Sequence, residues 1–187
     1  YTMESFVDDL MFVIDELKLN KPVLCGLSMG GYIAFRAIER EEEKFSAVIF
    51  CDTKSNADSN EAKITRANNI KRINKEGLYN FVVEFITNCF YPESIKILGN
   101  EFIQLIEEAK NFNPIGVKGS LLAMMGRTDT TDYLSKIKIP TLLLCGKYDK
   151  LTPPNAMQEV AEKINKSEFY IVPNAGHITP IENPEFI

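Results

Sequence analysis

The stretch that most constrains the fold is Val23–Gly31, where a short apolar run leads into the pattern Gly-x-Ser-x-Gly-Gly. The apolar run predicts a strand, and the helix-forming residues after Ser28 predict a helix. We expect Gly26 and Gly30 to be required because side chains there would collide across so sharp a turn, which leaves Ser28 strained and exposed at its tip. Unpaired N–H groups at the start of the helix suit a developing oxyanion. This context favours a nucleophilic serine, although the pattern also occurs in ordinary strand–helix turns.

Length and charge limit the alternatives. A chain of 187 residues is long enough for one domain with a substantial core. The formal net charge of -5, without a basic stripe, argues against nucleic-acid binding. No apolar run approaches membrane-spanning length, so we expect no transmembrane segment.

The cysteines and the first residue bear on the cellular compartment. Cys25, Cys51, Cys89 and Cys145 lack the spacing of zinc ligands, and we expect reduced core thiols in a cytoplasmic protein rather than disulfides. The sequence starts at Tyr1 without an initiating methionine, which leaves open a signal peptide upstream.

Strand patterns alternate with helical patterns at both ends of the chain. The first helix is expected over residues 2–19, capped by Thr2, with an apolar face. That face consists of Phe6, Leu10, Val13, Ile14 and Leu17. Four strands are expected, at Val23–Cys25, Ala47–Cys51, Pro140–Cys145 and Glu168–Val172. Between the second and third strands the sequence predicts only helices, at about 61–74, 77–89, 94–112 and 115–125.

This order predicts an α/β fold with a mostly parallel sheet, helices on both faces and an inserted helical cap. Residues 1–54 and 136–187 would form the core, incomplete at both ends, and residues 55–135 the cap. The cap would lie over the carboxyl ends of the strands, where ligands bind in open α/β sheets.

A serine nucleophile needs a base and a group that orients the base. His177 is the only histidine and lies in a loop directly after the last strand. Asp149 follows the third strand and is the predicted orienting acid, although an aspartate ahead of Thr152-Pro153 also suits a turn. Asp52, at the end of the second strand, is the rival for this role.

The order Ser28, Asp149, His177 is the one expected of an α/β-hydrolase. The whole chain resembles the carboxyl-terminal two-thirds of an enzyme with that fold. Gly26–Gly31 resembles the nucleophile elbow, Ile139–Pro154 the acid strand and loop, and Asn174–Glu185 the histidine loop with its trailing helix.

A finer resemblance, to small esterases of the 3-oxoadipate enol-lactonase-like group, rests on Asp52-Thr53 and Arg127-Thr128-Asp129. The general resemblance implies a Ser-His-Asp triad, an acyl-enzyme, and an oxyanion hole to which Met29 contributes its backbone N–H. It also implies four further strands upstream, one followed by a loop with the second oxyanion donor. Because that region is absent, we expect an incomplete chain with impaired catalysis.

The predicted function is hydrolysis of a carboxylic ester or lactone. Phe90, Met124 and Met125 are the predicted substrate-binding residues, with Phe81, Phe85 and Tyr91 as further candidates for lining the pocket, although such side chains at helical spacing are also typical of a plain core. Arg127 is the candidate for binding a substrate carboxylate, unless it pairs with Asp129 or Asp132. A non-catalytic protein that binds a small molecule, and an acyltransferase or perhydrolase with the same triad, remain alternatives. No metal or organic cofactor is implied, the expected partner is a small-molecule ester or lactone, and a homo-oligomer stays open.

Overall fold

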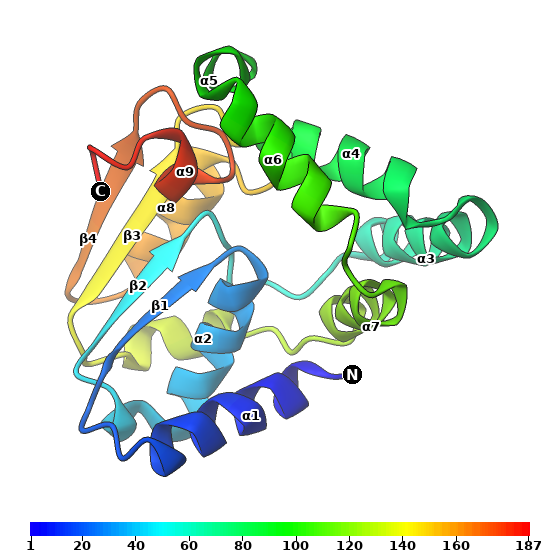
Figure 1. Cartoon of the computed structure of the whole chain (residues 1–187). Helices are drawn as coiled ribbons and strands as arrows, with labels where there is room; N and C mark the ends of the chain where they lie inside the picture. The colour runs from blue at the N-terminus through cyan, green and yellow to red at the C-terminus, as the bar shows by residue number, and fades with distance from the viewer.

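The computed structural model describes residues 1–187 and contains one parallel sheet with strand order β1-β2-β3-β4 (Figure 1). The strands are β1 (Val23–Leu27), β2 (Ala47–Cys51), β3 (Thr141–Gly146) and β4 (Ser167–Val172). The predicted α/β fold is confirmed, and the strand boundaries lie within two residues of those expected. All four strands run toward the helical cap, so their carboxyl ends share one edge of the sheet.

Three long helices cover one face of the sheet. They are α1 (Met3–Glu16), α2 (Met29–Glu41) and α8 (Pro154–Lys163), with the 3-10 helices η1 (Glu42–Lys44) and η2 (Thr131–Lys136) beside them. Their apolar side chains and those of the strands form one core of 18 buried residues. At its centre Phe35 of α2 stacks on Phe50 of β2 with ring centroids 3.8 Å apart. The core therefore fixes the helix that follows Ser28 against the neighbouring strand.

The opposite face of the sheet is covered much less. The short helix α9 (Thr179–Glu182) lies in front of β3 and β4, while α8 lies behind them (Figure 1). On this face Val23 and Cys25 of the edge strand β1 are exposed, as is Tyr170 of β4. Helices thus lie on both faces, as predicted, but unequally.

The face that the first helix buries overlaps only in part with the one expected. Thr2 caps it through a reciprocal pair of hydrogen bonds with Ser5, but the helix ends at Glu16. Its buried side chains are Met3, Val7, Met11 and Ile14, whereas the predicted Val13 and Leu17 are exposed. Apolar residues occupy two adjoining faces of this helix, so periodicity alone could not identify the buried one.

Ion pairs join α1 to α2 beside the buried face. Glu4 accepts from Arg36 Nε at 2.6 Å, and Asp8 accepts from Arg40 Nη2 at 2.7 Å. These two carboxylates lie one turn apart on α1 and accompany the packing of Val7 into the core. The orientation of α1 therefore depends on contacts with residues 32 positions away in the sequence.

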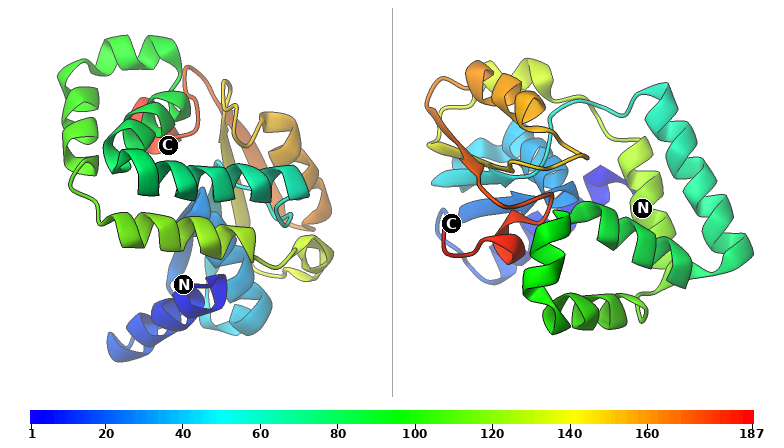
Figure 2. Two further views of the ribbon diagram at one scale, coloured as in Figure 1. Left: turned by 90° about the vertical axis from the view of Figure 1, so that its right-hand side faces the viewer. Right: turned by 90° about the horizontal axis from the view of Figure 1, so that it is seen from above.

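Five helices lie between β2 and β3 and stand over the carboxyl ends of the strands (Figures 1 and 2). They are α3 (Asn60–Glu76), α4 (Leu78–Cys89), α5 (Pro92–Leu98), α6 (Asn100–Ala109) and α7 (Pro114–Met125). The helix predicted over 94–112 is two helices, because Gly99 adopts a φ of 52° and ends α5. The cap has its own apolar cluster, which includes Phe81 and Leu121.

The four cysteines are free thiols, of which Cys51, Cys89 and Cys145 are buried. Cys25 was expected in the core but is exposed, because β1 is an edge strand and Cys25 lies on its uncovered face. No helix is both long enough and apolar enough to cross a membrane.

Candidate active site

Ser28 occupies the sharp turn between β1 and α2. Its φ of 52° and ψ of -114° are unusual for a residue with a side chain and confirm the strained turn expected there. The turn is held from both sides: Ser28 N–H donates to Cys51 O at 2.9 Å, and Thr53 Oγ1 donates to Ser28 O at 2.8 Å. The end of β2 therefore supports the backbone on which the serine hydroxyl is mounted.

Of the two glycines expected to prevent a collision across the turn, Gly26 does so and Gly30 does not. A Cβ on Gly26 would lie 2.5 Å from Gly30 O, and a Cβ on Gly31 would overlap the side chain of Thr53. A Cβ on Gly30 would meet nothing within 4 Å, so the expectation that Gly30 prevents a collision is wrong. The close approaches are those of Gly26 to the start of α2, and of Gly31 to β2.

Three side chains from the ends of three strands form a continuous line of hydrogen bonds. Ser28 Oγ lies 2.7 Å from His177 Nε2, and His177 Nδ1 lies 2.8 Å from Asp149 Oδ2. A carboxylate can only accept, so His177 Nδ1 carries the proton and Nε2 is free to accept from the serine hydroxyl. The imidazole is 3% exposed, which shields this arrangement from bulk water.

Asp149 is surrounded by donors that favour its charged form. Its Oδ1 accepts from the N–H groups of Leu151 and Thr152 at 2.8 and 2.9 Å, and its Oδ2 accepts from Thr152 Oγ1 at 2.5 Å. Burial alone would raise the pKa of Asp149, but the hydrogen bonds and charge of His177, together with Thr152, lower it below its ordinary value. The carboxylate is therefore ionised beside the imidazole.

Asp52, the rival acid, makes no hydrogen bond to His177. It accepts from Gly146 N–H at 2.9 Å, and from the N–H and Oγ1 of Thr179 at 3.2 and 2.7 Å. Asp52 is completely buried, and this desolvation raises the pKa of its carboxyl to about 7 despite the three hydrogen bonds. The side chain ties the end of β2 to the end of β3 and to the loop that carries His177.

One cluster of three buried groups has the composition of a metal site. Ligand atoms of Asp52, Cys145 and Asp149 lie within 4.8 Å of one another. Both carboxylates are already engaged with protein donors, and Cys145 Sγ donates to Thr152 O at 3.3 Å. Burial raises the pKa of the Cys145 thiol, which opposes the thiolate form that binds metals. All three side chains therefore serve to hold the loops at the carboxyl ends of the strands.

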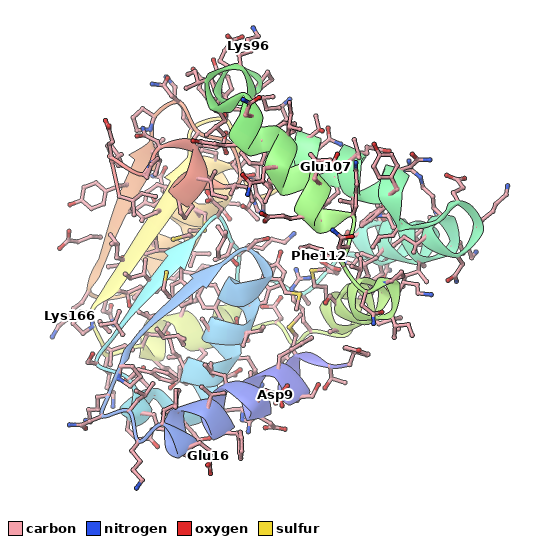
Figure 3. The ribbon with its side chains drawn as sticks, viewed as in Figure 1. Asp9, Glu16, Lys96, Glu107, Phe112 and Lys166 are labelled. Carbon is pink, nitrogen blue, oxygen red and sulfur yellow. The ribbon has the colours of Figure 1, made fainter.

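A cavity of about 650 Å³ opens beside Ser28 and His177. Its walls come from the elbow, α4, α7 and the turn before α7, where Phe112 lies (Figure 3). Twelve of its 20 lining residues are hydrophobic, including Phe81 and Phe85, so the cavity suits an apolar substrate body.

Only some of the residues predicted to face the substrate line this cavity. Phe81, Phe85 and Met124 line it, whereas the other candidates lie outside its lining, namely Phe90, Tyr91, Met125 and Arg127. Phe90 packs edge-on against Phe102 within the cap, with ring centroids 5.2 Å apart. Sequence spacing identified apolar helix faces but could not tell which faces meet each other and which line the cavity.

Arg127 is a buried structural cation. It pairs with Asp58, not with Asp129 or Asp132, and its Nε donates to Asn56 O at 2.9 Å. Its guanidinium also lies 4.2 Å from the centre of the Tyr32 ring. Because each guanidinium nitrogen donates to a protein oxygen and the residue is buried outside the cavity lining, Arg127 joins the exit of the cap to its entrance and does not face a substrate carboxylate.

Two further contributions to the site escaped the sequence analysis. Glu182 accepts from Gly176 N–H at 2.8 Å and Ile178 N–H at 3.1 Å, on either side of His177. Lys54, three residues beyond the end of β2, lines the cavity. Its position just past a strand end is the same signal that identified Asp149.

Comparisons with known proteins show what the chain is similar to. The model of a family described as serine aminopeptidase S33 matches residues 2–184. The chain is 28% identical over 191 residues to a putative 2-succinyl-6-hydroxy-2,4-cyclohexadiene-1-carboxylate synthase of Bacillus subtilis, covering 98% of this chain and 69% of the relative. It is 22% identical over 184 residues to 3-oxoadipate enol-lactonase 1 of Acinetobacter baylyi, covering 98% and 67%.

Two solved structures superimpose on the whole of this chain. A thermophilic esterase from Thermogutta terrifontis, solved with malate bound, superimposes with a TM-score of 0.94 at 35% identity, covering all of this chain and 69% of the esterase. The enol-lactonase of Burkholderia xenovorans superimposes with a TM-score of 0.90 at 22% identity, covering all of this chain and 70% of that enzyme. Because the sequence identity to the Burkholderia enol-lactonase is only 22%, this similarity shows a shared fold alone.

The contact between Gly31 and Thr53 predicts opposite effects of alanine at neighbouring glycines. Gly31→Ala should lower the free energy of unfolding by about 1–3 kcal/mol, because its Cβ displaces Thr53. Gly30→Ala should be neutral, or stabilising by up to about 1 kcal/mol, because alanine favours the helix. Urea denaturation of the two variants measures this, and equal losses would contradict the structure.

The raised pKa of Asp52 predicts a pH-dependent stability. Between its ordinary value of 3.8 and about 7, the folded protein holds a proton that the unfolded chain has released. That stabilisation is full below about pH 3.8 and is lost as the pH rises through about 7. From about pH 5 to 7.5, the unfolding free energy should fall by ~2 kcal/mol more than in Asp52→Asn.

Denaturation curves across this pH range measure the difference. The exposed Asp9, replaced by asparagine, is the matched control and should follow the wild type (Figure 3). Parallel pH profiles for the wild type and Asp52→Asn would show that Asp52 is charged throughout.

The buried pair of Arg127 and Asp58 predicts a large loss of stability when it is broken. Arg127→Met should cost about 3–5 kcal/mol, because Asp58 would keep only Arg66 as its cationic partner in a buried position. Arg72→Met, which removes the exposed pairs with Glu76 and Glu84, should cost about 1 kcal/mol or less. Urea denaturation compares the two, and similar losses would contradict a structural role for Arg127.

Proposed function

Because the chain belongs to the serine aminopeptidase S33 family of hydrolases, we propose that it cleaves a carboxylic ester or lactone through an acyl-enzyme on Ser28. The observation that carries this proposal is the line of hydrogen bonds from Ser28 Oγ through His177 to Asp149. It joins a nucleophile, a base and an orienting acid beside an apolar cavity. The esterase and enol-lactonase among the similar proteins favour ester and lactone substrates.

The geometry supports a two-step reaction. His177 Nε2 takes the proton of Ser28 as Oγ attacks the acyl carbon, and the imidazolium then returns the proton to the leaving alkoxide. In the second step water attacks the acyl carbon as His177 takes one of its protons, the bond to Ser28 Oγ breaks to release the acid, and the imidazolium returns the proton to Oγ. The ionised Asp149 fixes the tautomer of His177 and stabilises the imidazolium that forms in each step.

Met29 is the oxyanion donor in this proposal. It is the first residue of α2, so its N–H has no acceptor within the helix, and it follows Ser28 directly. An N–H in this position would point at the charge that develops on the substrate oxygen, and one such donor accounts for about 10²–10³ in turnover.

A fluorophosphonate probe tests the proposal, because it reacts only with an activated serine. We expect the wild type to be labelled, and Ser28→Ala and His177→Ala to remain unlabelled. Asp149→Asn should react about 10⁴-fold more slowly, since the imidazole would lose its fixed tautomer. Mass spectrometry of the labelled peptide identifies the modified residue.

Ser120 provides the matched control, because it is a second serine that lines the same cavity. Ser120→Ala should be labelled like the wild type. Labelling that survives in Ser28→Ala, or a folded wild type that is never labelled, would contradict the proposal and favour a protein that binds without catalysis.

A further inference from the structure

We propose that Lys54 forms a carboxylate-binding subsite in the cavity beside Ser28, so that the preferred substrate carries a carboxylate apart from the bond that is cleaved. This inference rests on the proposed function, since it names the substrate class of the same site. It assigns to Lys54 the contact that the sequence analysis expected of Arg127.

The backbone places Lys54 next to the nucleophile. Thr53 Oγ1 donates to Ser28 O at 2.8 Å, so the chain at residues 53–54 lies against the elbow. Lys54 is half-buried and lines the cavity together with Ser28 and His177. A substrate whose acyl carbon lies at Ser28 therefore extends through the space that the lysine borders.

Lys54 is a cation without an anionic partner. No carboxylate lies within 4.0 Å of its Nζ, whereas Arg66 and Arg127 both pair with Asp58. The cavity lining includes Lys54 and Arg66 but no aspartate or glutamate. Burial, with the nearby Arg127 and Arg66, lowers the pKa of Lys54 by more than the nearby Asp58 raises it. An entering anion would compensate the charge of Lys54.

The rest of the cavity restricts what else the substrate contains. Most of its lining is apolar, with aromatic side chains from α4 and the turn before α7. A densely charged molecule would leave its other polar groups unpaired against these walls, at a cost in binding. The chemistry that fits is an apolar body with one carboxylate, such as the monoester of a dicarboxylic acid or the ester of a hydroxy acid.

Matched ester pairs test the subsite. Monomethyl esters of four- to six-carbon dicarboxylic acids are compared with methyl esters of monocarboxylic acids of equal length, which places the charge on the acyl side. The butanoate ester of 3-hydroxypropanoate, compared with propyl butanoate, places it on the alcohol side. The measurement is kcat/KM, by the release of acid or alcohol.

In the wild type we expect at least one anionic ester to exceed its neutral partner. Lys54→Met should lower kcat/KM for that ester about 10- to 100-fold, the range for a lost charged hydrogen bond, and change neutral esters less than about 3-fold. Lys54→Arg should retain most of the preference. Lys71→Met makes the same change in net charge at an exposed position and should behave as the wild type.

Binding separates the failure of this inference from the failure of the proposed function. Calorimetry measures binding of the monomethyl dicarboxylates and of the neutral esters to Ser28→Ala, with and without Lys54→Met. Binding of the anion that requires Lys54 supports the subsite even if the wild type hydrolyses nothing. The wild type could instead hydrolyse neutral esters while Lys54→Met and Lys71→Met change kcat/KM for the anionic esters equally, or not at all. That result would overturn the subsite and leave the proposed function standing.

Discussion

The structure depends on the turn at Ser28, where a residue with a side chain is held at a positive φ. Such a conformation costs about 1–3 kcal/mol and persists only when its surroundings compensate. Here the compensation comes from β2, because Cys51 O accepts from the Ser28 N–H and Thr53 donates to Ser28 O. The absence of a side chain on Gly31 lets Thr53 come close enough to do this. Ser28 is therefore positioned by the end of a neighbouring strand as much as by its own turn.

The loop that carries His177 is fixed from two directions. From below, Thr179 is bound to Asp52 at the end of β2. From above, His177 N–H donates to Cys89 O at 2.6 Å, and Glu182 accepts from the N–H of Tyr91 as well as from the histidine loop. Because Cys89 and Tyr91 belong to the cap, the cap helps to place His177 as well as to enclose the cavity.

Sequence patterns predicted the parts of this protein that depend on local signals. The four strands, the elbow and the three polar residues at strand ends could all be recognised, because parallel strands bring their carboxyl ends to one edge. The buried face of α1, the pairing of Arg127 with Asp58 and the lining of the cavity could not. Each of these three features depends on contacts between side chains that are far apart in the sequence. Several partners of suitable charge or polarity were available for each contact, so the sequence alone could not select one.

The two aspartates beside the site show how environment separates residues that the sequence left as rivals. Asp149 accepts hydrogen bonds from Thr152 and faces the histidine, so its pKa is lowered. Asp52 also accepts three hydrogen bonds, but all come from neutral donors, and burial raises its pKa to about 7. Only Asp149 has an ionisable partner whose positive charge it can stabilise. Neighbouring carboxyl groups whose pKa values are shifted in opposite directions can take different roles. Asp149 accepts the hydrogen bond of the His177 imidazole, and Asp52 holds together the strand end and the loop that position His177.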